Sequence, residues 1–420
     1  MRTSLGRADI QIDVDSSEVM ASLTESSLQY GNIARNMIKQ VAIKLKDVAP
    51  TPSSLRAVPH VDSPSTETAV HLAQLFQHYY FDSYPTGPPK PDPSRFEYLN
   101  LISGSRDFRF HEFVSAASIV RRRTIATELG QAFCRCMLHD HFRIVYFAHM
   151  YDVLDRPTHA AFEGLRVERS GRGDVPDYLC ARKVTLPLLA EAKGRSSKIS
   201  FESAEWAKWQ EQFSRIHAVD RAGTPRDLKG YTVATEFVSA ASPASKRTTV
   251  FIQDPEPPSE TRLTVADATP IGRVIVAMHY ARVFSKLGLS LLAGALLNGY
   301  MLSPELSFQV PIWRCMTPPF ENVTFVGGIY RTLEGALPSM QSDGNWSPPF
   351  ELGAGHLVFV GVNQHIAEMV AQAARGDWAL LDNLPLSEPV GVWSSEFGWL
   401  LDGSVVAPAM SFRPATTVTL

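Results

Sequence analysis

The sequence has little cysteine, no marked excess of charge of either sign and no long uninterrupted apolar run. Four cysteines in 420 residues are too few for a disulfide framework. The formal net charge of −3 excludes the overall basic character that marks many nucleic-acid-binding proteins. A protein of this charge that binds a polyanion would need basic residues gathered in one groove. The candidate basic residues are Arg121–Arg123, Arg182, Lys183, Lys193, Arg195 and Lys198. The alternative is that these residues belong to an ordinary solvated face.

The apolar residues exclude a membrane-spanning helix. The longest apolar stretch, residues 287–302, is broken by glycine, serine and asparagine and is too short to cross a bilayer. The N-terminal residues, beginning Met1-Arg2-Thr3, lack the apolar core of a signal peptide. We therefore expect a cytoplasmic protein that has no membrane partner.

The composition is that of a folded protein with two or three domains, with 45% hydrophobic and 20% charged residues. Residues 1–105 are predicted to form a helical and proline-rich N-terminal extension. Apolar residues recur at every fourth position from residue 33 to 45, which predicts a helix over residues 30–48. Residues 66–81 predict a second helix.

Residues 106–255 are predicted to form an α/β domain. A helical pattern over residues 113–138 is followed by short β-rich segments, an amphipathic helix over residues 201–216 and two further strands. This order predicts a mixed central sheet flanked by helices. The β-rich segments are residues 142–147, 165–169, 178–180, 185–192, 231–238 and 248–253.

Residues 256–420 are predicted to form a C-terminal α+β domain of unknown role, after the proline-rich segment 254–258. Helical patterns cover residues 269–300, with a break at 287–289, and residues 364–375. No catalytic motif is present in this part of the sequence. Strand patterns cover residues 308–313, 323–326 and 357–362.

The central segment carries a pattern that points to chemistry. Asp177 directly follows a proline, and Glu191 and Lys193 stand two residues apart at the end of an apolar run. Because side chains alternate along a strand, Glu191 and Lys193 are expected on one face and Ala192 on the other. Two carboxylates and a main-chain carbonyl are oxygen ligands of the kind that Mg²⁺ prefers.

This pattern resembles the PD-(D/E)xK, or restriction-endonuclease-like, nuclease superfamily over residues 107–255. The resemblance implies a restriction-endonuclease-like core that places the Asp and the Glu-x-Lys on adjacent strands of one sheet. It makes Asp177, Glu191 and the carbonyl of Ala192 ligands of Mg²⁺, for which Mn²⁺ can substitute. Lys193 would then orient or help to deprotonate the attacking water.

Two further catalytic residues come from the resemblance alone. Glu128 lies on the helix before the sheet, where many members carry an acidic residue that reaches the metal. Gln210 lies on the following helix, where members of the exonuclease branch often carry a glutamine. That branch also has a tyrosine four residues later, and this chain has Ser214 there, which leaves endonuclease and exonuclease activity as alternatives.

The pattern and the resemblance predict a metal-dependent nuclease that hydrolyses phosphodiester bonds, with DNA as the expected substrate. Analogy suggests a role in phage defence or in mobile-element and DNA processing, as a homodimer or with a partner protein. One alternative is an inactive restriction-endonuclease-like module that binds nucleic acid or assembles complexes. The other is a structural or adaptor protein with a coincidental pattern, in which the carboxyl groups of Asp177 and Glu191 lie more than about 8 Å apart.

Overall fold

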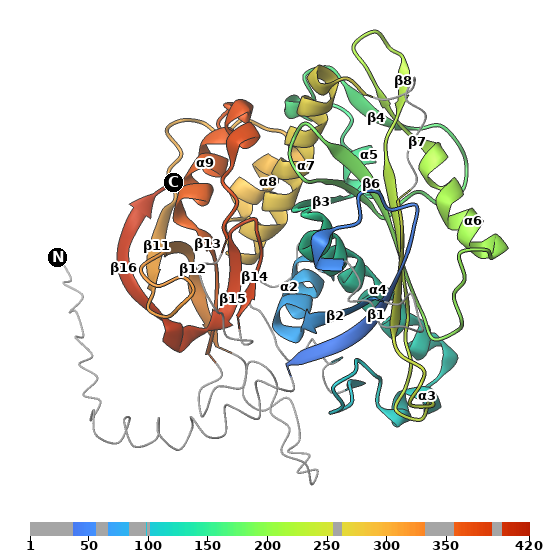
Figure 1. The fold of residues 1–420 in the computed structure, drawn as a ribbon. Coiled ribbons are helices and arrows are strands. Elements are labelled where there is room, and N and C mark those ends of the chain that lie inside the picture. Colours follow the sequence, from blue (N-terminus) through green and yellow to red (C-terminus); the bar gives the residue numbers. More distant parts are fainter. Residues whose placement is uncertain are drawn as a thin grey trace, which may run out of the picture.

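The computed structural model describes residues 37–55, 66–83, 98, 101–254, 263–331, 357–388 and 397–420. In these residues the chain forms two large sheets with a layer of helices between them (Figure 1). The layer consists of α2 (Leu72–Ser83), α4 (Ile119–Phe142) and α7 (Val265–Lys286), which between them contact strands of both sheets. The described chain is therefore a mixed α/β protein with an additional sheet.

The larger sheet has seven strands in the order β2-β1-β10-β9-β6-β5-β3. The β3–β5 and β5–β6 pairs are antiparallel, whereas the β6–β9 and β1–β10 pairs are parallel. The predicted mixed central sheet flanked by helices is confirmed, with α4 on one face and α6 (Ala204–Glu211) on the other (Figure 1). The strands are β1 (Ile38–Lys46), β2 (Thr66–His71), β3 (Tyr146–His149), β5 (Tyr178–Ala181), β6 (Pro187–Arg195), β9 (Gly230–Glu236) and β10 (Thr249–Gln253).

The described part of residues 1–105 differs from the predicted helical extension. Residues 38–46 form β1 and residues 66–71 form β2, before α2 begins at Leu72. The prediction of a helix is therefore wrong for residues 38–46 and 66–71, because the pairing of β1 with β10 and of β2 with β1 outweighs the local periodicity. Residues 72–81 of the second predicted helix are helical, as part of α2. Residues 1–36 and 84–97 of the predicted extension lie outside the described residues.

The smaller sheet is antiparallel and has six strands in the order β14-β15-β13-β12-β11-β16. The predicted break at residues 287–289 is confirmed, because α7 ends at Lys286 and α8 (Ser290–Asn298) follows. The predicted helix at 364–375 corresponds to α9 (Gln364–Ala373). No helix among the described residues is long and apolar enough to cross a membrane. The strands are β11 (Gln309–Cys315), β12 (Thr324–Arg331), β13 (Leu357–Asn363), β14 (Gly398–Trp399), β15 (Ser404–Pro408) and β16 (Phe412–Thr419).

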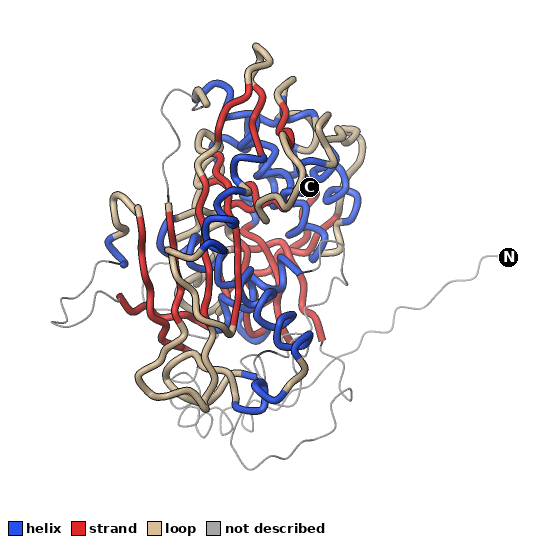
Figure 2. Tube along the Cα trace, turned by 90° about the vertical axis from the view of Figure 1, so that its right-hand side faces the viewer, coloured by secondary structure: helices blue, strands red, loops and turns tan. Residues whose placement is uncertain are grey.

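Three short strands form a separate sheet at one end of the molecule, at the top of Figures 1 and 2. They are β4 (Arg166–Arg169), β7 (Ile216–Val219) and β8 (Pro225–Asp227), in the order β4-β7-β8. The strand predicted at residues 165–169 is thus present, but it lies outside the central sheet.

Two glycines let α4 lie directly on β6. A Cβ added at Gly194 would lie 1.7 Å from the carbonyl oxygen of Ala126, and one at Gly130 would lie 2.6 Å from the nitrogen of Gly194. The main chains of helix and strand therefore touch with no side chain between them. Because strand side chains alternate, Gly194 faces α4, and Glu191 and Lys193 project from the opposite face of the sheet.

Gly194→Ala is expected to destabilise the protein by at least about 2–3 kcal/mol, because the new methyl group meets main-chain atoms that cannot rotate away. Gly294→Ala in α8 is the matched control, since nothing lies within 4 Å of its added Cβ. That change should instead stabilise the helix by roughly 0.5–1 kcal/mol. Urea unfolding followed by circular dichroism measures both, and equal effects would contradict the packing described here.

Candidate active site

Asp177, Glu191 and Lys193 meet where β5 begins. Strand β5 starts directly after Asp177, and its pairing with β6 stops at Ala190. Asp177 lies just beyond the last β5–β6 pair, and its Oδ2 accepts a hydrogen bond of 2.8 Å from the N–H of Ala192. Its own N–H donates to Oε2 of Glu191 at 3.2 Å. Main-chain and side-chain contacts therefore fix the two carboxylates relative to each other.

The two carboxylates of Asp177 and Glu191, hereafter the carboxylate pair, flank one ammonium group. Nζ of Lys193 contacts Oε1 of Glu191 and lies 4.0 Å from Oδ2 of Asp177. The structure thus brings together the three residues on which the prediction depends. A coincidental pattern would place the carboxyl groups more than about 8 Å apart, which is not the arrangement found.

Burial decides the charge states at this site. The side chain of Glu191 is 0% exposed, and burial together with the charge of Asp177 raises its pKa to about 8. Burial disfavours the charge of Lys193 as well, but the carboxylate pair outweighs it, so the pKa of Lys193 is raised. Lys193 therefore remains a cation at neutral pH, whereas Glu191 is mostly protonated unless a further cation binds.

Gln212 is a site residue that the sequence prediction missed. Its Nε2 donates a 2.6 Å hydrogen bond to Oε1 of Glu191, and its side chain is buried. The predicted Gln210 lies on α6 two residues earlier and is only half-buried. A signal was present in the sequence, because the buried Trp206 and Trp209 are three residues apart and Gln212 continues that spacing.

The position of Gln212 depends on the turn that follows α6. Residues Phe213–Arg215 form a 3₁₀ turn, and the ring of Phe213 lies against Gly230 at the start of β9. A Cβ added at Gly230 would lie 2.7 Å from that ring. The absence of a side chain at Gly230 therefore allows the turn to lie close enough to β6 for Gln212 to reach Glu191.

The structure does not bring Glu128 to the carboxylate pair. Ala126 and Gly130 form the face of α4 that contacts β6, and Glu128 lies about half a turn away from both. Its Oε2 accepts hydrogen bonds from the hydroxyls of Tyr98 and, at 3.5 Å, Tyr79. The resemblance could not specify on which face of the helix this acidic residue would lie.

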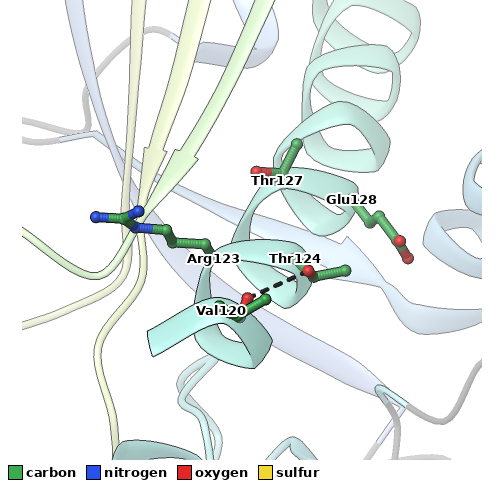
Figure 3. A pocket seen from close by; sticks show the side chains of 5 residues that line it. All are labelled: Val120, Arg123, Thr124, Thr127 and Glu128. Atoms are coloured by element: carbon green, nitrogen blue, oxygen red, sulfur yellow. Dashed lines mark hydrogen bonds between the residues drawn. The ribbon is translucent and has the colours of Figure 1, made fainter. Parts of the chain in front are cut away.

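Glu128 instead lines a hollow of about 370 Å³ along the first half of α4. Arg123 and Glu128 project from opposite sides of the helix, and Thr124 Oγ1 donates to the carbonyl of Val120 (Figure 3). This hollow does not include the carboxylate pair. Its lining residues are Val120, Arg123, Thr124, Thr127 and Glu128.

The donor atoms at the site suit a hard divalent cation. No group of three or more His, Cys, Asp or Glu side chains that could hold a metal occurs in the described part of the chain. The carboxylate pair supplies two such groups, and Mg²⁺ is commonly held by one or two carboxylates with waters and phosphate. The N–H and C=O of Ala192 point to the same edge of β6, toward Asp177, which makes its carbonyl a suitable third oxygen.

A buried network anchors the residue that follows Asp177. The hydroxyl of Tyr178 donates to Oδ2 of Asp82 at 2.7 Å, and Oδ1 of Asp82 pairs with Arg135 at 2.7 Å and with His149 at 2.9 Å. Burial alone would raise the pKa of Asp82, but its basic partners hold it well below its usual range. The network joins α2, α4, β3 and β5, so residues of the predicted extension help to position the site.

Glu191→Gln is expected to change how stability depends on pH when EDTA is present. The folded pKa of about 8 lies above the ordinary value of 4.5, so the folded state holds this proton more tightly than the unfolded state. The stabilisation from that proton is complete below about pH 4.5 and is lost as the pH rises through about 8. The thermal midpoint of the variant should therefore rise relative to wild type between about pH 5 and 8.

Thermal unfolding across this pH range measures the effect, with Glu202→Gln at an exposed position as the matched control. Parallel curves for wild type and Glu191→Gln would contradict the assignment of a raised pKa to Glu191.

Comparison of the chain with protein-family models, with curated proteins and with solved structures finds no match. What the protein does is therefore inferred from the chemistry of its residues.

Proposed function

We propose that the protein is a metal-dependent nuclease of the PD-(D/E)xK type that hydrolyses phosphodiester bonds, with DNA as the expected substrate. The observation that carries the proposal is the meeting of Asp177, Glu191 and Lys193 at one end of β5 and β6. A carboxylate pair that shares one ammonium and has one buried member is poorly explained as a stabilising feature, because it burdens the fold with the desolvation of Glu191.

The order of elements around the site supports the restriction-endonuclease-like core. A helix, three antiparallel strands, a second helix and a parallel strand follow one another as α4, β3, β5, β6, α6 and β9. The short helix α5 (Met150–Leu154) and the strands β4, β7 and β8 interrupt this order, and these three strands belong to another sheet. Asp177 directly precedes β5 and Glu191 lies on the adjacent strand β6, close to the arrangement that the resemblance implies.

Each residue has a distinct role in the proposed reaction. A divalent cation held by the carboxylate pair would lower the pKa of a bound water and neutralise charge that develops on the phosphate. Gln212 orients Glu191 by donating to Oε1. Because the pKa of Lys193 is raised, its ammonium would attract and orient the phosphate group rather than act as a base.

Two arginines near the site, Arg169 at the end of β4 and Arg172 in the loop that follows, support a polyanionic substrate. Asp174 in this loop lies close enough to Lys193 to raise the pKa of its ammonium. Arg169 donates to the carbonyls of Gly171 and Gly173, which carry no net charge and so do not neutralise it. Arg172 is exposed on the same loop. Arg169 and Arg172 would therefore offer positive charge near the carboxylate pair to a phosphate backbone.

Asp177→Ala and Lys193→Ala are each expected to lower cleavage by roughly 100-fold or more, because each removes a charge at the reacting phosphate. The measurement is cleavage of supercoiled plasmid, linear duplex, single-stranded DNA and RNA with Mg²⁺, Mn²⁺ or EDTA. Arg314→Ala, an exposed change on β11 of the smaller sheet, is the control and should retain full activity.

Cleavage that persists in Asp177→Ala would place the active site elsewhere. No cleavage of any substrate, together with nucleic-acid binding that Asp177→Ala leaves unchanged, would favour the alternative of an inactive binding module.

Arg172→Ala is expected to weaken binding of a short DNA duplex and to lower the slope of log affinity against log salt by about 1, because one phosphate contact is lost. Fluorescence anisotropy in EDTA at several salt concentrations measures both quantities without cleavage. Arg314→Ala makes the same change on β11 of the smaller sheet and serves as the control. Equal effects of the two changes would show that the loop does not contact the duplex.

A further inference from the structure

A buried hydroxyl on β9 lacks a hydrogen-bond partner beside Glu191. Thr232 is 0% exposed, and its Oγ1 has no partner among the described residues. A buried polar group without a partner costs roughly 1–3 kcal/mol. Such a group at a proposed active site indicates that another molecule supplies the missing bond.

The strand register places Thr232 on the same face of the sheet as the site. Glu191 on β6 lies opposite Thr232 on the parallel strand β9, and Lys193 lies opposite Ala234. Ala234 packs against Trp206 beneath α6, and side chains of facing residues on neighbouring strands share a face. Thr232 therefore flanks Glu191 on the side away from Asp177.

The partners of Glu191 are distributed unevenly around it. The N–H of Asp177, the ammonium of Lys193 and the amide of Gln212 all contact its carboxylate. The hydroxyl of Thr232 makes no hydrogen bond to Glu191, although Thr232 lies opposite Glu191 on the neighbouring strand. A hydroxyl both donates and accepts, so a water molecule is a suitable partner for it.

We propose that Thr232 is a positioning residue for the divalent cation, and that its hydroxyl binds a water molecule of the cation's hydration shell. This inference rests on the proposed function, because it requires a cation at the carboxylate pair. Mg²⁺ gives up its waters reluctantly and usually keeps several of them. Groups that hold such outer-shell contacts commonly change metal affinity by 10–100-fold when removed.

Thr235 provides a matched control on the same strand. It too is 0% exposed with an unpartnered hydroxyl. It lies opposite Gly194, whose added Cβ would meet α4, so Thr235 faces away from the site. A general effect of replacing a buried threonine should appear at both positions, whereas a change in cation affinity should appear only when Thr232 is replaced.

The test is cation-induced thermal stabilisation of the full chain, titrated with MgCl₂, MnCl₂ and CaCl₂ in the absence of substrate. In EDTA, Thr232→Val and Thr235→Val should each be as stable as wild type or more stable, because neither loses a hydrogen bond. Thr232→Val should raise the apparent cation dissociation constant about 10-fold, Thr232→Ser should restore it, and Thr235→Val should leave it unchanged. In cleavage assays Thr232→Val should need more Mg²⁺ but approach the wild-type rate at saturation.

Three outcomes separate this inference from the proposed function. Unchanged cation affinity in Thr232→Val, with stabilisation lost in Asp177→Ala, would overturn the role of Thr232 and leave the cation site standing. Equal loss in Thr232→Val and Thr235→Val would overturn the role as well, since it would show a general packing effect. No stabilisation of the wild type by any of the three cations would overturn both proposals.

Discussion

The close approach of α4 to β6 is the constraint on which the rest of the site depends. Gly130 and Gly194 bring the main chain of the helix against the main chain of the strand. Since side chains alternate along β6, the requirement for glycine on the α4 face fixes Glu191 and Lys193 on the α6 face. A residue with a Cβ at position 194 would push the strand away from the helix and shift both charged side chains with it.

Burial of Glu191 follows from this placement and explains the chemistry of the site. The carboxylate lies in the interior of a seven-stranded sheet under the turn that carries Gln212. Its charge is maintained by Lys193 and opposed by desolvation and by Asp177. Because the pKa of Glu191 is about 8, binding of one more cation would shift its carboxyl group to the charged form at neutral pH.

The elements that the sequence predicted correctly have strong local signals. The break between α7 and α8 coincides with Gly288, which has a φ of +76°, and the Glu-x-Lys spacing places both side chains on one face of β6. The failure at β1 has the opposite cause. Apolar residues at positions 33, 37, 41 and 45 repeat as in a helix, but Val41, Ile43 and Leu45 also alternate as in a strand, and the pairing with β10 depends on residues that are distant in the sequence. Local periodicity carries no information about such a partner.

The sequence predicted only those site residues that lie close together along the chain. Asp177 joins Glu191 across neighbouring strands that are close in sequence, so a short pattern could identify both. Gln212 contacts Glu191 because of a 3₁₀ turn, and Thr232 lies beside Glu191 because of a parallel register, neither of which leaves a motif. Parallel pairing requires a long crossover between its strands, and the residues that it brings together are separated by α6. A short sequence pattern therefore identifies Asp177 and Glu191, but it does not identify Gln212 and Thr232.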